Sequence, residues 1–427
     1  MEASSQKSVL NGTVLVPASK SHTIRAIVIA SLAHGKSVIA SPLDSFDTRS
    51  AADAARAFGA HIDIAGDQWM ISGVGSEPRI PEDVINVGNS GTTLYFSMGT
   101  ASLVEGWTVL TGDCQIRRRT AAPLINALGP LGAEVFSTRG NGMAPLVIRG
   151  KITGGAASVS GISSQYISSL LLACPLAAGD TELIVTVLNE RPYVTMTLNW
   201  LAGQGIVPEI SSDMSSIKIR GGQSYSAFKK RIPADFSSAA FPLCAGVLAG
   251  GTVVLKDLDI NDPQGDKEIM YILRKMGASI ETSIDGITVR GGTLRGIDID
   301  MNSIPDALPI MAVCACFAEG TTVLKNVPQA RIKETDRIAV MARELGKLGA
   351  NIKELPDGLI IKGTGLRGGK VHGHGDHRVV MALTVAGFAS DGTVTVDTAE
   401  AASVTYPGFW DMLRSLGAKI QIKDENG

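Results

Sequence analysis

The stretch VPASKSHTIRA, residues 16–26, gathers hydroxyls and cations where a predicted strand gives way to a predicted helix. Ser19, Lys20, Ser21 and Arg25 all lie near the start of that helix. Backbone N–H groups at a helix N-terminus can donate hydrogen bonds, and the helix dipole adds partial positive charge there. Together with the hydroxyls and cations, they predict a binding site for an anion.

Polar residues recur at the starts of other predicted helices. The small residues of GNSGTTLYF, 88–96, would let backbone N–H groups approach a ligand, and SGISSQY places hydroxyls just before an apolar helix. A carboxylate at a helix start, as in IPDALPIM, is favoured by the helix dipole. The candidates at these positions are Asn89, Gly91, Thr92, Ser163, Ser164, Gln165, Asp235, Asp306, Lys333, Glu334, Asp336, Arg337, Asp376, His377 and Arg378.

Each of these residues also has a plainer interpretation. Ser, Thr and Asp before a helix are ordinary N-caps, and KETDR could be the exposed first turn of a helix. Because the same feature recurs at equivalent places along the chain, we favour a shared binding site over independent caps.

Three further motifs suggest other chemistry. ASLAHGKS fits a loose phosphate-loop pattern, but it follows a helix and precedes a strand, which is the reverse of what that loop needs. HGHGDH could hold a metal through His372, His374, Asp376 and His377, although no matching Cys or Glu lies nearby in the sequence. Cys114 precedes three arginines that would favour its thiolate, yet a lone cysteine is more often structural.

Composition limits the class of protein. The 427 residues are 44% hydrophobic and 19% charged, with a formal net charge of −2, which argues against bulk binding of nucleic acid. The five cysteines form no CxxC pair and are odd in number, so a disulfide framework is not expected. Neither a signal peptide nor an apolar run long enough to span a membrane is visible, which indicates a cytoplasmic protein.

A repeated pattern sets the expected architecture. A helix end, a glycine, a strand, a turn and a second strand recur about every 72 residues. We expect each glycine to end its helix in a left-handed conformation, at Gly59, Gly132, Gly205, Gly277, Gly349 and Gly417. Several other helices, such as ALPIMAVCACFAEG, are apolar nearly all round and should be buried, with sheets outside. Six α/β units divide most simply into two domains of three, with a ligand cleft between them.

The motifs SKSHTIRA, GNSGTT, SSQYISSLLLA, PDA, KETDRI and GDHR, in this order, resemble those of the 5-enolpyruvylshikimate-3-phosphate synthase family. The resemblance implies an inside-out α/β barrel in each of two domains, residues 1–16 with 233–427 and residues 17–232. It implies transfer of the enolpyruvyl group of phosphoenolpyruvate to the 5-hydroxyl of shikimate 3-phosphate, with loss of phosphate. It further implies a cytoplasmic monomer that needs no metal or organic cofactor and is the target of glyphosate.

The same resemblance assigns roles to individual residues. Asp306 would take the proton of the 5-hydroxyl, while Glu334 with Lys20 would handle the methylene proton, and His377 joins them as a catalytic residue. Shikimate 3-phosphate would be held by Lys20, Ser21, Arg25, Ser163, Ser164, Gln165, Tyr193, Asp306 and Lys333. Phosphoenolpyruvate would be held by Lys20, Asn89, Gly91, Thr92, Arg119, Gln165, Glu334, Arg337, His377 and Arg378.

Four positions depart from the family pattern. Glu190 stands where a serine usually touches the 3-phosphate, and Val404 stands where a lysine usually serves the phosphoenolpyruvate site. Gln329 replaces an asparagine, and Tyr95 replaces an arginine. A carboxylate that faces a phosphate is unfavourable unless a cation such as Arg191 or Arg220 neutralises it. These changes bear on affinity and, less strongly, on the identity of the acceptor.

Two alternatives stay open at this point. The sister enzyme that transfers enolpyruvyl to UDP-N-acetylglucosamine would place a reactive cysteine near Cys114, but it has KN where this chain has SKS and lacks the SSQ motif. A non-catalytic six-repeat binding scaffold would have no need of Lys20, Asp306, Glu334 and His377 together.

Overall fold

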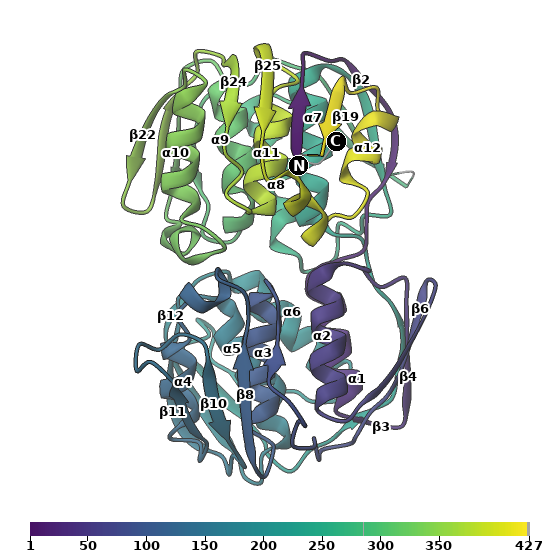
Figure 1. Cartoon of the computed structure of the whole chain (residues 1–427), viewed down its shortest axis with the longest axis vertical. Helices are drawn as coiled ribbons and strands as arrows, with labels where there is room; N and C mark the ends of the chain where they lie inside the picture. Colours follow the sequence, from purple (N-terminus) through teal and green to yellow (C-terminus); the bar gives the residue numbers. More distant parts are fainter. Residues whose placement is uncertain (285, 425–427) are drawn as a thin grey trace. The chain divides into compact units, whose positions relative to one another are not determined.

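The computed structural model describes residues 1–284 and 286–424. The chain divides into two compact units (Figure 1): unit 1 comprises Met1–Pro17 and Pro233–Gly427, and unit 2 comprises Ala18–Ile232. The chain therefore passes from unit 1 to unit 2 after Pro17 and returns to unit 1 after Ile232. Among the described residues, no helix is both long and apolar enough to cross a membrane.

Unit 2 combines six helices with three four-stranded sheets among its described residues. The helices are α1 (Lys20–Ser31), α2 (Phe46–Ala57), α3 (Gly91–Ala101), α4 (Ala122–Leu128), α5 (Ser164–Ala173) and α6 (Arg191–Ala202). The sheets are β16 (Lys229–Arg231), β4 (Lys36–Ala40), β6 (Gln68–Ser72), β5 (His61–Ala65); β7 (Ile85–Asn86), β8 (Trp107–Thr111), β10 (Leu146–Arg149), β9 (Glu134–Ser137); and β11 (Gly155–Gly161), β12 (Thr181–Leu188), β14 (Ser216–Ile219), β13 (Glu209–Ile210). A small pair joins β15 (Tyr225–Ser226) to β3 (Ala33–His34).

Unit 1 has the same make-up. Its helices are α7 (Phe236–Ala249), α8 (Glu268–Met276), α9 (Leu308–Cys316), α10 (Arg337–Lys347), α11 (His377–Ala386) and α12 (Phe409–Ser415). Its sheets are β18 (Ser279–Ser283), β19 (Gly286–Arg290), β17 (Gly251–Lys256), β2 (Leu10–Leu15); β20 (Asp298–Asp300), β21 (Thr321–Lys325), β23 (Gly358–Lys362), β22 (Asn351–Leu355); and β24 (Arg367–Val371), β25 (Asp391–Val396), β1 (Glu2–Ser5), β26 (Ile420–Lys423).

The six four-stranded sheets share one pattern of pairing among the described residues. Each has one parallel pair at an edge, such as β11 with β12 or β2 with β17, followed by two antiparallel pairs. Parallel strands need a crossover connection, and in β11 and β12 that crossover is α5. Likewise α3, α9 and α11 connect the parallel pairs β7–β8, β20–β21 and β24–β25, and the motifs GNSGTT, SSQ, PDA and GDHR fall at the starts of these crossover helices. The motif KETDRI instead falls at the start of α10, which lies between β21 and β22.

The apolar helices lie inside, as the sequence predicts. All nine residues of α9 and thirteen of the fourteen residues of α7 are buried. By contrast, α8 buries only one face, through Ile269, Met270, Leu273 and Met276, as an amphipathic surface helix does. Each unit has its own hydrophobic core.

The six repeated glycines end helices or follow helix ends, as predicted. All six have positive φ, from +76° at Gly205 to +107° at Gly277. In Gly277 the left-handed conformation lets its N–H and that of Ala278 bond the last carbonyls of α8. A side chain with a Cβ would be strained at these positions, which explains why glycine recurs there.

Candidate active site

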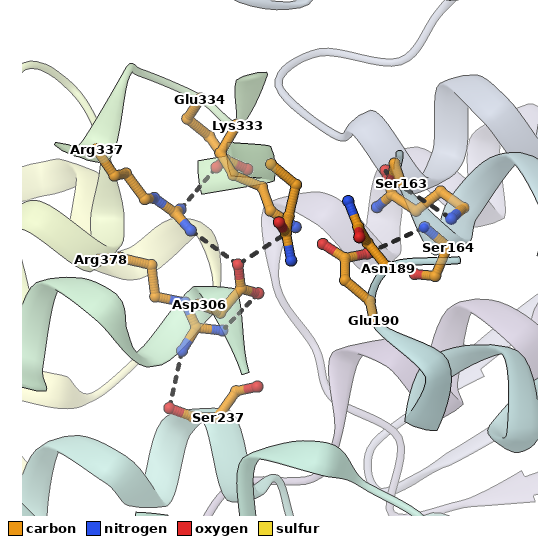
Figure 2. Close-up of polar contacts among 12 residues, drawn as sticks. Ser163, Ser164, Asn189, Glu190, Ser237, Asp306, Lys333, Glu334, Arg337 and Arg378 are labelled. Carbon is orange, nitrogen blue, oxygen red and sulfur yellow. Dashed lines mark hydrogen bonds and ion pairs between the residues drawn. The ribbon is translucent and has the colours of Figure 1, made fainter. Parts of the chain in front are cut away.

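A buried arginine organises the polar groups of unit 1. Arg337 is the first residue of α10 and is 1% exposed. Its Nε lies 2.9 Å from Oδ2 of Asp376, its Nη1 lies 2.8 Å from Oδ1 of Asp306, and its Nη2 lies 2.6 Å from Oε2 of Glu334. Figure 2 shows Arg337 between Glu334 and Asp306. One guanidinium thus joins three carboxylates that come from three helix starts.

The charge of Arg337 is fixed by these carboxylates. Burial alone would lower the pKa of the guanidinium, but Asp376, Glu334 and Asp306 outweigh burial and raise it. Arg337 therefore remains a cation at every physiological pH. Its position also follows from local structure, because Asp336 caps α10 by accepting a hydrogen bond from the N–H of Ala339.

Two further cations approach Asp306. Lys333 Nζ lies 3.6 Å from its Oδ1, and Nη2 of Arg378 lies 3.8 Å from its Oδ2. Arg378 is held in place by a hydrogen bond to the carbonyl of Ser237 (Figure 2). Its guanidinium also lies 5.7 Å from the centroid of the Phe241 ring. Asp306 is 25% exposed, so it combines a strongly cationic surrounding with access to a ligand.

Asp376 is the partner that fixes this cluster, a role that sequence reasoning missed. It is fully buried, caps α11 through the N–H of Arg378, and accepts from both Thr335 and Arg337. The sequence marked Asp376 as a polar residue at a helix start, but it did not indicate which residue Asp376 would contact. The long-range contact with Arg337 has no sequence signal, because the two residues belong to different helices. His377, the next residue, is 2% exposed.

Lys20 of unit 2 is paired with a buried acid. It begins α1, and its Nζ lies 3.0 Å from Oδ2 of Asp47, whose side chain is 5% exposed. Asp47 lies in the first turn of α2, and its carbonyl accepts from Thr93 at a longer 3.4 Å. The sequence offered no pattern for this pair, so Asp47 is a second residue that sequence reasoning missed.

The start of α3 is closely packed, and we call the surface formed by Asn89, Gly91, Thr92 and Arg119 the wall. Ser90 caps the helix, and Thr92 accepts a 2.7 Å hydrogen bond from the amide of Gln165. A Cβ placed on Gly91 would lie 2.3 Å from Nη1 of Arg119. Gly91 is therefore the residue that lets the Arg119 guanidinium lie against the helix start.

Neighbouring groups hold Asn89 and Arg119 in this wall. The Asn89 amide donates to Asp113 Oδ2 at 2.6 Å and to Gln115 Oε1 at 2.8 Å. Arg119 is 7% exposed and lies 5.8 Å from the ring of Tyr95, one of the positions that depart from the family pattern. Tyr95 donates its hydroxyl to the carbonyl of Thr120, so it supports the wall rather than supplying a charge.

Arg25 is a buried cation that, within the described ranges, donates hydrogen bonds to neutral oxygens and lies over the ring of Phe96. It is 2% exposed and donates to the carbonyls of Ser21 and Tyr193 and to the hydroxyls of Thr197 and Ser168. Burial lowers its pKa to about 10. A guanidinium in these surroundings remains protonated at neutral pH and would gain from a bound anion.

The start of α5 already holds a carboxylate. Ser163 caps the helix, and Oε2 of Glu190 accepts from the N–H of Ser164 at 3.1 Å and from its hydroxyl at 2.6 Å (Figure 2). Glu190 is 2% exposed. Arg191, one of the cations considered as its neutralising partner, donates to the carbonyl of Ser212 instead.

The other two departures lie in unit 1. Gln329 is 1% exposed and donates to the carbonyl of Asn302. Val404 is half-buried at the end of the short 3-10 helix Ala399–Val404.

The histidines of HGHGDH have other partners. His372 Nδ1 lies 2.6 Å from the carboxylate of Asp397, and His374 Nε2 lies 3.0 Å from Glu344. Within the described part of the chain, no group of three or more His, Cys, Asp or Glu side chains could hold a metal ion. Cys114 is exposed, whereas the other four cysteines are buried.

The predicted residues therefore fall into two sets. Unit 1 brings together Asp306, Lys333, Glu334, Arg337 and Arg378, with His377 beside them in sequence. Unit 2 carries Lys20, Ser21, Arg25, Asn89, Gly91, Thr92, Arg119, Ser163, Ser164, Gln165 and Tyr193. Acids held next to cations at helix starts can exchange protons with an anionic substrate, and the cations can stabilise a departing anion.

Comparisons with known proteins agree with this chemistry. The family model described as EPSP synthase (3-phosphoshikimate 1-carboxyvinyltransferase) matches residues 5–413. A 3-phosphoshikimate 1-carboxyvinyltransferase of Acetivibrio thermocellus is 52% identical over 97% of this chain and 98% of its own length. A 3-phosphoshikimate 1-carboxyvinyltransferase of Ruminiclostridium cellulolyticum is 51% identical over 98% of this chain and 99% of its own length. The solved structure of EPSP synthase from Acinetobacter baumannii is 28% identical, covers 99% of this chain and 100% of its own, and has a TM-score of 0.82.

Proposed function

The chain belongs to the EPSP synthase family, and on this premise we propose which of its residues carry out the family's reaction. The protein transfers the enolpyruvyl group of phosphoenolpyruvate to the 5-hydroxyl of shikimate 3-phosphate and releases phosphate, a step of the shikimate pathway to chorismate and the aromatic amino acids. This identity sets aside both the UDP-N-acetylglucosamine transferase and the non-catalytic scaffold.

We propose that Asp306 is the base for the 5-hydroxyl. The reaction is an addition followed by an elimination: the hydroxyl oxygen attacks the carbon that carries the phosphate, and the methylene carbon gains a proton. Arg337, Lys333 and Arg378 surround Asp306 and stabilise its negative charge. Its partial exposure leaves an oxygen within reach of a substrate hydroxyl.

We assign the methylene proton to Glu334, acting with Lys20. Glu334 shares Arg337 with Asp306, so one cation lies between two acids with separate tasks. In the elimination step the methyl carbon loses a proton and the carbon–oxygen bond to phosphate breaks. The departing phosphate would be stabilised by the nearby cations.

The substrate anions are assigned to the remaining polar groups. Phosphoenolpyruvate would lie against Lys20, Asn89, Gly91, Thr92, Arg119, Gln165, Arg337, His377 and Arg378. Shikimate 3-phosphate would lie against Lys20, Ser21, Arg25, Ser163, Ser164, Gln165, Tyr193 and Lys333. Local cation clusters of this kind explain how a chain of net charge −2 can bind two polyanions.

We further propose that the two units close around the substrates. Each unit supplies only part of the residues assigned above, so the reaction needs groups from both. Small-angle scattering tests this step: the radius of gyration should fall when shikimate 3-phosphate and glyphosate are added together. Identical scattering with and without these ligands, at concentrations that calorimetry shows to be saturating, would contradict closure.

The finer points of architecture are proposals of the same kind. The shared pairing of the six sheets supports six repeats of about 72 residues, three in each inside-out α/β barrel. We propose a cytoplasmic monomer, and sedimentation equilibrium would test its mass.

The cluster of Asp306, Glu334 and Arg337 is the observation that carries the proposed roles. The test is phosphate release from phosphoenolpyruvate with shikimate 3-phosphate as acceptor. Asp306→Asn should lower kcat by about a hundredfold or more, because general base catalysis is lost while shape is kept. A kcat near that of the wild type would rule out Asp306 as the base.

A further inference from the structure

Glu190 adopts a backbone conformation that its residue type disfavours. It lies between β12 and α6 with φ +54° and ψ +40°, in the left-handed region. A glutamate is uncommon there, and this position at the start of a helix is usually taken by a residue that caps the helix with its side chain. The Glu190 side chain does not cap α6. Some other contact must account for its placement.

That contact is with the neighbouring helix start. A single oxygen, Oε2, accepts both hydrogen bonds that Ser164 can donate there, from its N–H and from its hydroxyl. Asn189 anchors the same loop by donating to the carbonyl of Ile162, just before the cap of α5. The carboxylate therefore lies where the dipole of α5 favours a negative charge. Glu190 behaves as an anion bound in an anion site, supplied by the chain itself.

The donors of Ser164 are also those assigned above to the acceptor phosphate. A phosphate ester needs several donors for its oxygen atoms, and it carries nearly two negative charges at neutral pH. It cannot share the N–H and hydroxyl of Ser164 with a carboxylate in the same place, and the two negative groups repel one another. Either the carboxylate moves away, or the phosphate binds with fewer donors.

We propose that Glu190 is an internal ligand of the acceptor-phosphate subsite, which the phosphate of shikimate 3-phosphate must displace from Ser164 in order to bind. This inference rests on the proposed role of Ser164. Arg25, a buried cation, donates to Ser168 of α5 and to the carbonyl of Tyr193, three residues after Glu190, so its charge lies beside both helices and would favour an incoming phosphate. Glu190 thus sets the affinity for the phosphorylated acceptor and makes it lower than a neutral residue would.

The experiment measures the binding of shikimate 3-phosphate by calorimetry to wild type, Glu190→Gln and Glu190→Gly. Glutamine keeps the shape without the charge, and glycine suits the left-handed backbone, so at least one variant should fold normally. The control is Glu182→Gln, on β12, where the carboxylate is 45% exposed and pairs with Lys218. Thermal unfolding confirms the fold of each variant.

We expect the dissociation constant for shikimate 3-phosphate to fall at least tenfold in both Glu190 variants. A tenfold fall corresponds to about 1.4 kcal/mol of binding free energy. It should be unchanged in Glu182→Gln. The KM for phosphoenolpyruvate, at saturating acceptor, should stay within twofold of wild type. If Glu190 had only a structural role, its replacement would weaken the binding of both substrates. Folded Glu190 variants that bind the acceptor no more tightly than wild type would overturn the proposal.

Ser164→Ala separates this inference from the site assignment on which it rests. If Ser164→Ala weakens the binding of shikimate 3-phosphate but the Glu190 variants do not strengthen it, the subsite stands and the role of Glu190 is wrong. If Ser164→Ala leaves acceptor binding unchanged, the subsite itself is wrong, and the role of Glu190 falls with it.

Discussion

At the scale of single residues, Arg337 shows how one buried cation can serve two acids. Asp376 takes two of its hydrogen bonds and fixes the guanidinium in place. The remaining donors reach Asp306 and Glu334, which we assign to two different proton transfers.

Cys114 offers a test at the residue scale. It is exposed and stands before three arginines, the feature that favoured a cysteine nucleophile in a sister enzyme. In the mechanism proposed above it has no role. Cys114→Ser should therefore keep kcat and both KM values within about twofold in the phosphate-release assay. A loss of tenfold or more in kcat would show that the thiol takes part in the reaction.

The sequence predicted the polar residues at helix starts, but it did not predict their partners. Ser19, Ser90, Ser163, Asp235, Asp336 and Asp376 all cap helices, a contact made within a few residues of the chain. Asp47 holds Lys20, and Thr197 holds Arg25, over separations of 27 and 172 residues. Such pairs depend on how helices pack, and no local pattern encodes them.

At the scale of elements, helix starts carry the site: those of the largely buried helices α1, α3, α5, α9 and α11, and that of α10, which is buried on one face and supplies Arg337. A buried helix cannot place polar side chains along its length without leaving them unsatisfied, whereas its first turn has donors to offer. The glycines that end the surface helices could be predicted because a left-handed residue has a strong local preference for glycine. The pairing order of the strands could not, since it depends on contacts far apart in the chain.

The start of α3 gives a prediction for this scale. Gly91→Ala would place a Cβ 2.3 Å from Nη1 of Arg119, so that the guanidinium must move. We expect the KM for phosphoenolpyruvate to rise about tenfold and glyphosate to bind more weakly, because a shift of this size disturbs the position of an assigned cation. Steady-state kinetics would measure both effects.

Gly346→Ala is the matched control for Gly91→Ala. Gly346 also lies in a helix, α10, but a Cβ there would meet nothing within 4 Å. It should leave the kinetics unchanged and raise the free energy of unfolding by about 0.5 kcal/mol. Wild-type KM values in both variants would show that the wall around Gly91 does not contact phosphoenolpyruvate.

Glu344 of α10 gives a prediction about pH and stability. Burial alone would raise the pKa of its carboxyl, but hydrogen bonds from the N–H of His372 and from Lys347, His374 and Arg343 outweigh burial and lower it to about 2. Because the pKa is depressed in the folded state, the stabilisation is fully present above the unfolded pKa of about 4.5. It is lost as the pH falls from there towards 2.

Glu344→Gln should therefore lower the free energy of unfolding at pH 7 by about 2 kcal/mol. The difference between variant and wild type should shrink below pH 4. Chemical denaturation at pH 7, 5 and 3.5 would measure it. A difference that stays constant over this range would mean that the ionised carboxylate is not the source of the stabilisation.

At the scale of the whole molecule, the two units repeat one construction with different side chains. Unit 1 carries the carboxylates assigned to proton transfer, and unit 2 carries most of the hydroxyls and amides assigned to substrate binding. The family resemblance and the mixed α/β class could be predicted from the sequence, because the motifs are local and keep their order. The internal carboxylate at Ser164 could not, because the sequence indicates only that Glu190 departs from the family pattern.

The central claim is that one reaction uses acid and base groups from both units. Single-turnover phosphate release tests it most directly, in Lys20→Gln of unit 2 and Glu334→Gln of unit 1. Lys36→Gln and Glu319→Gln, exposed residues of the same types in the same units, serve as controls. We predict that Lys20→Gln and Glu334→Gln each lower the rate by about a hundredfold or more, while the controls match wild type. A folded Lys20→Gln or Glu334→Gln variant that releases phosphate at the wild-type rate would contradict the claim.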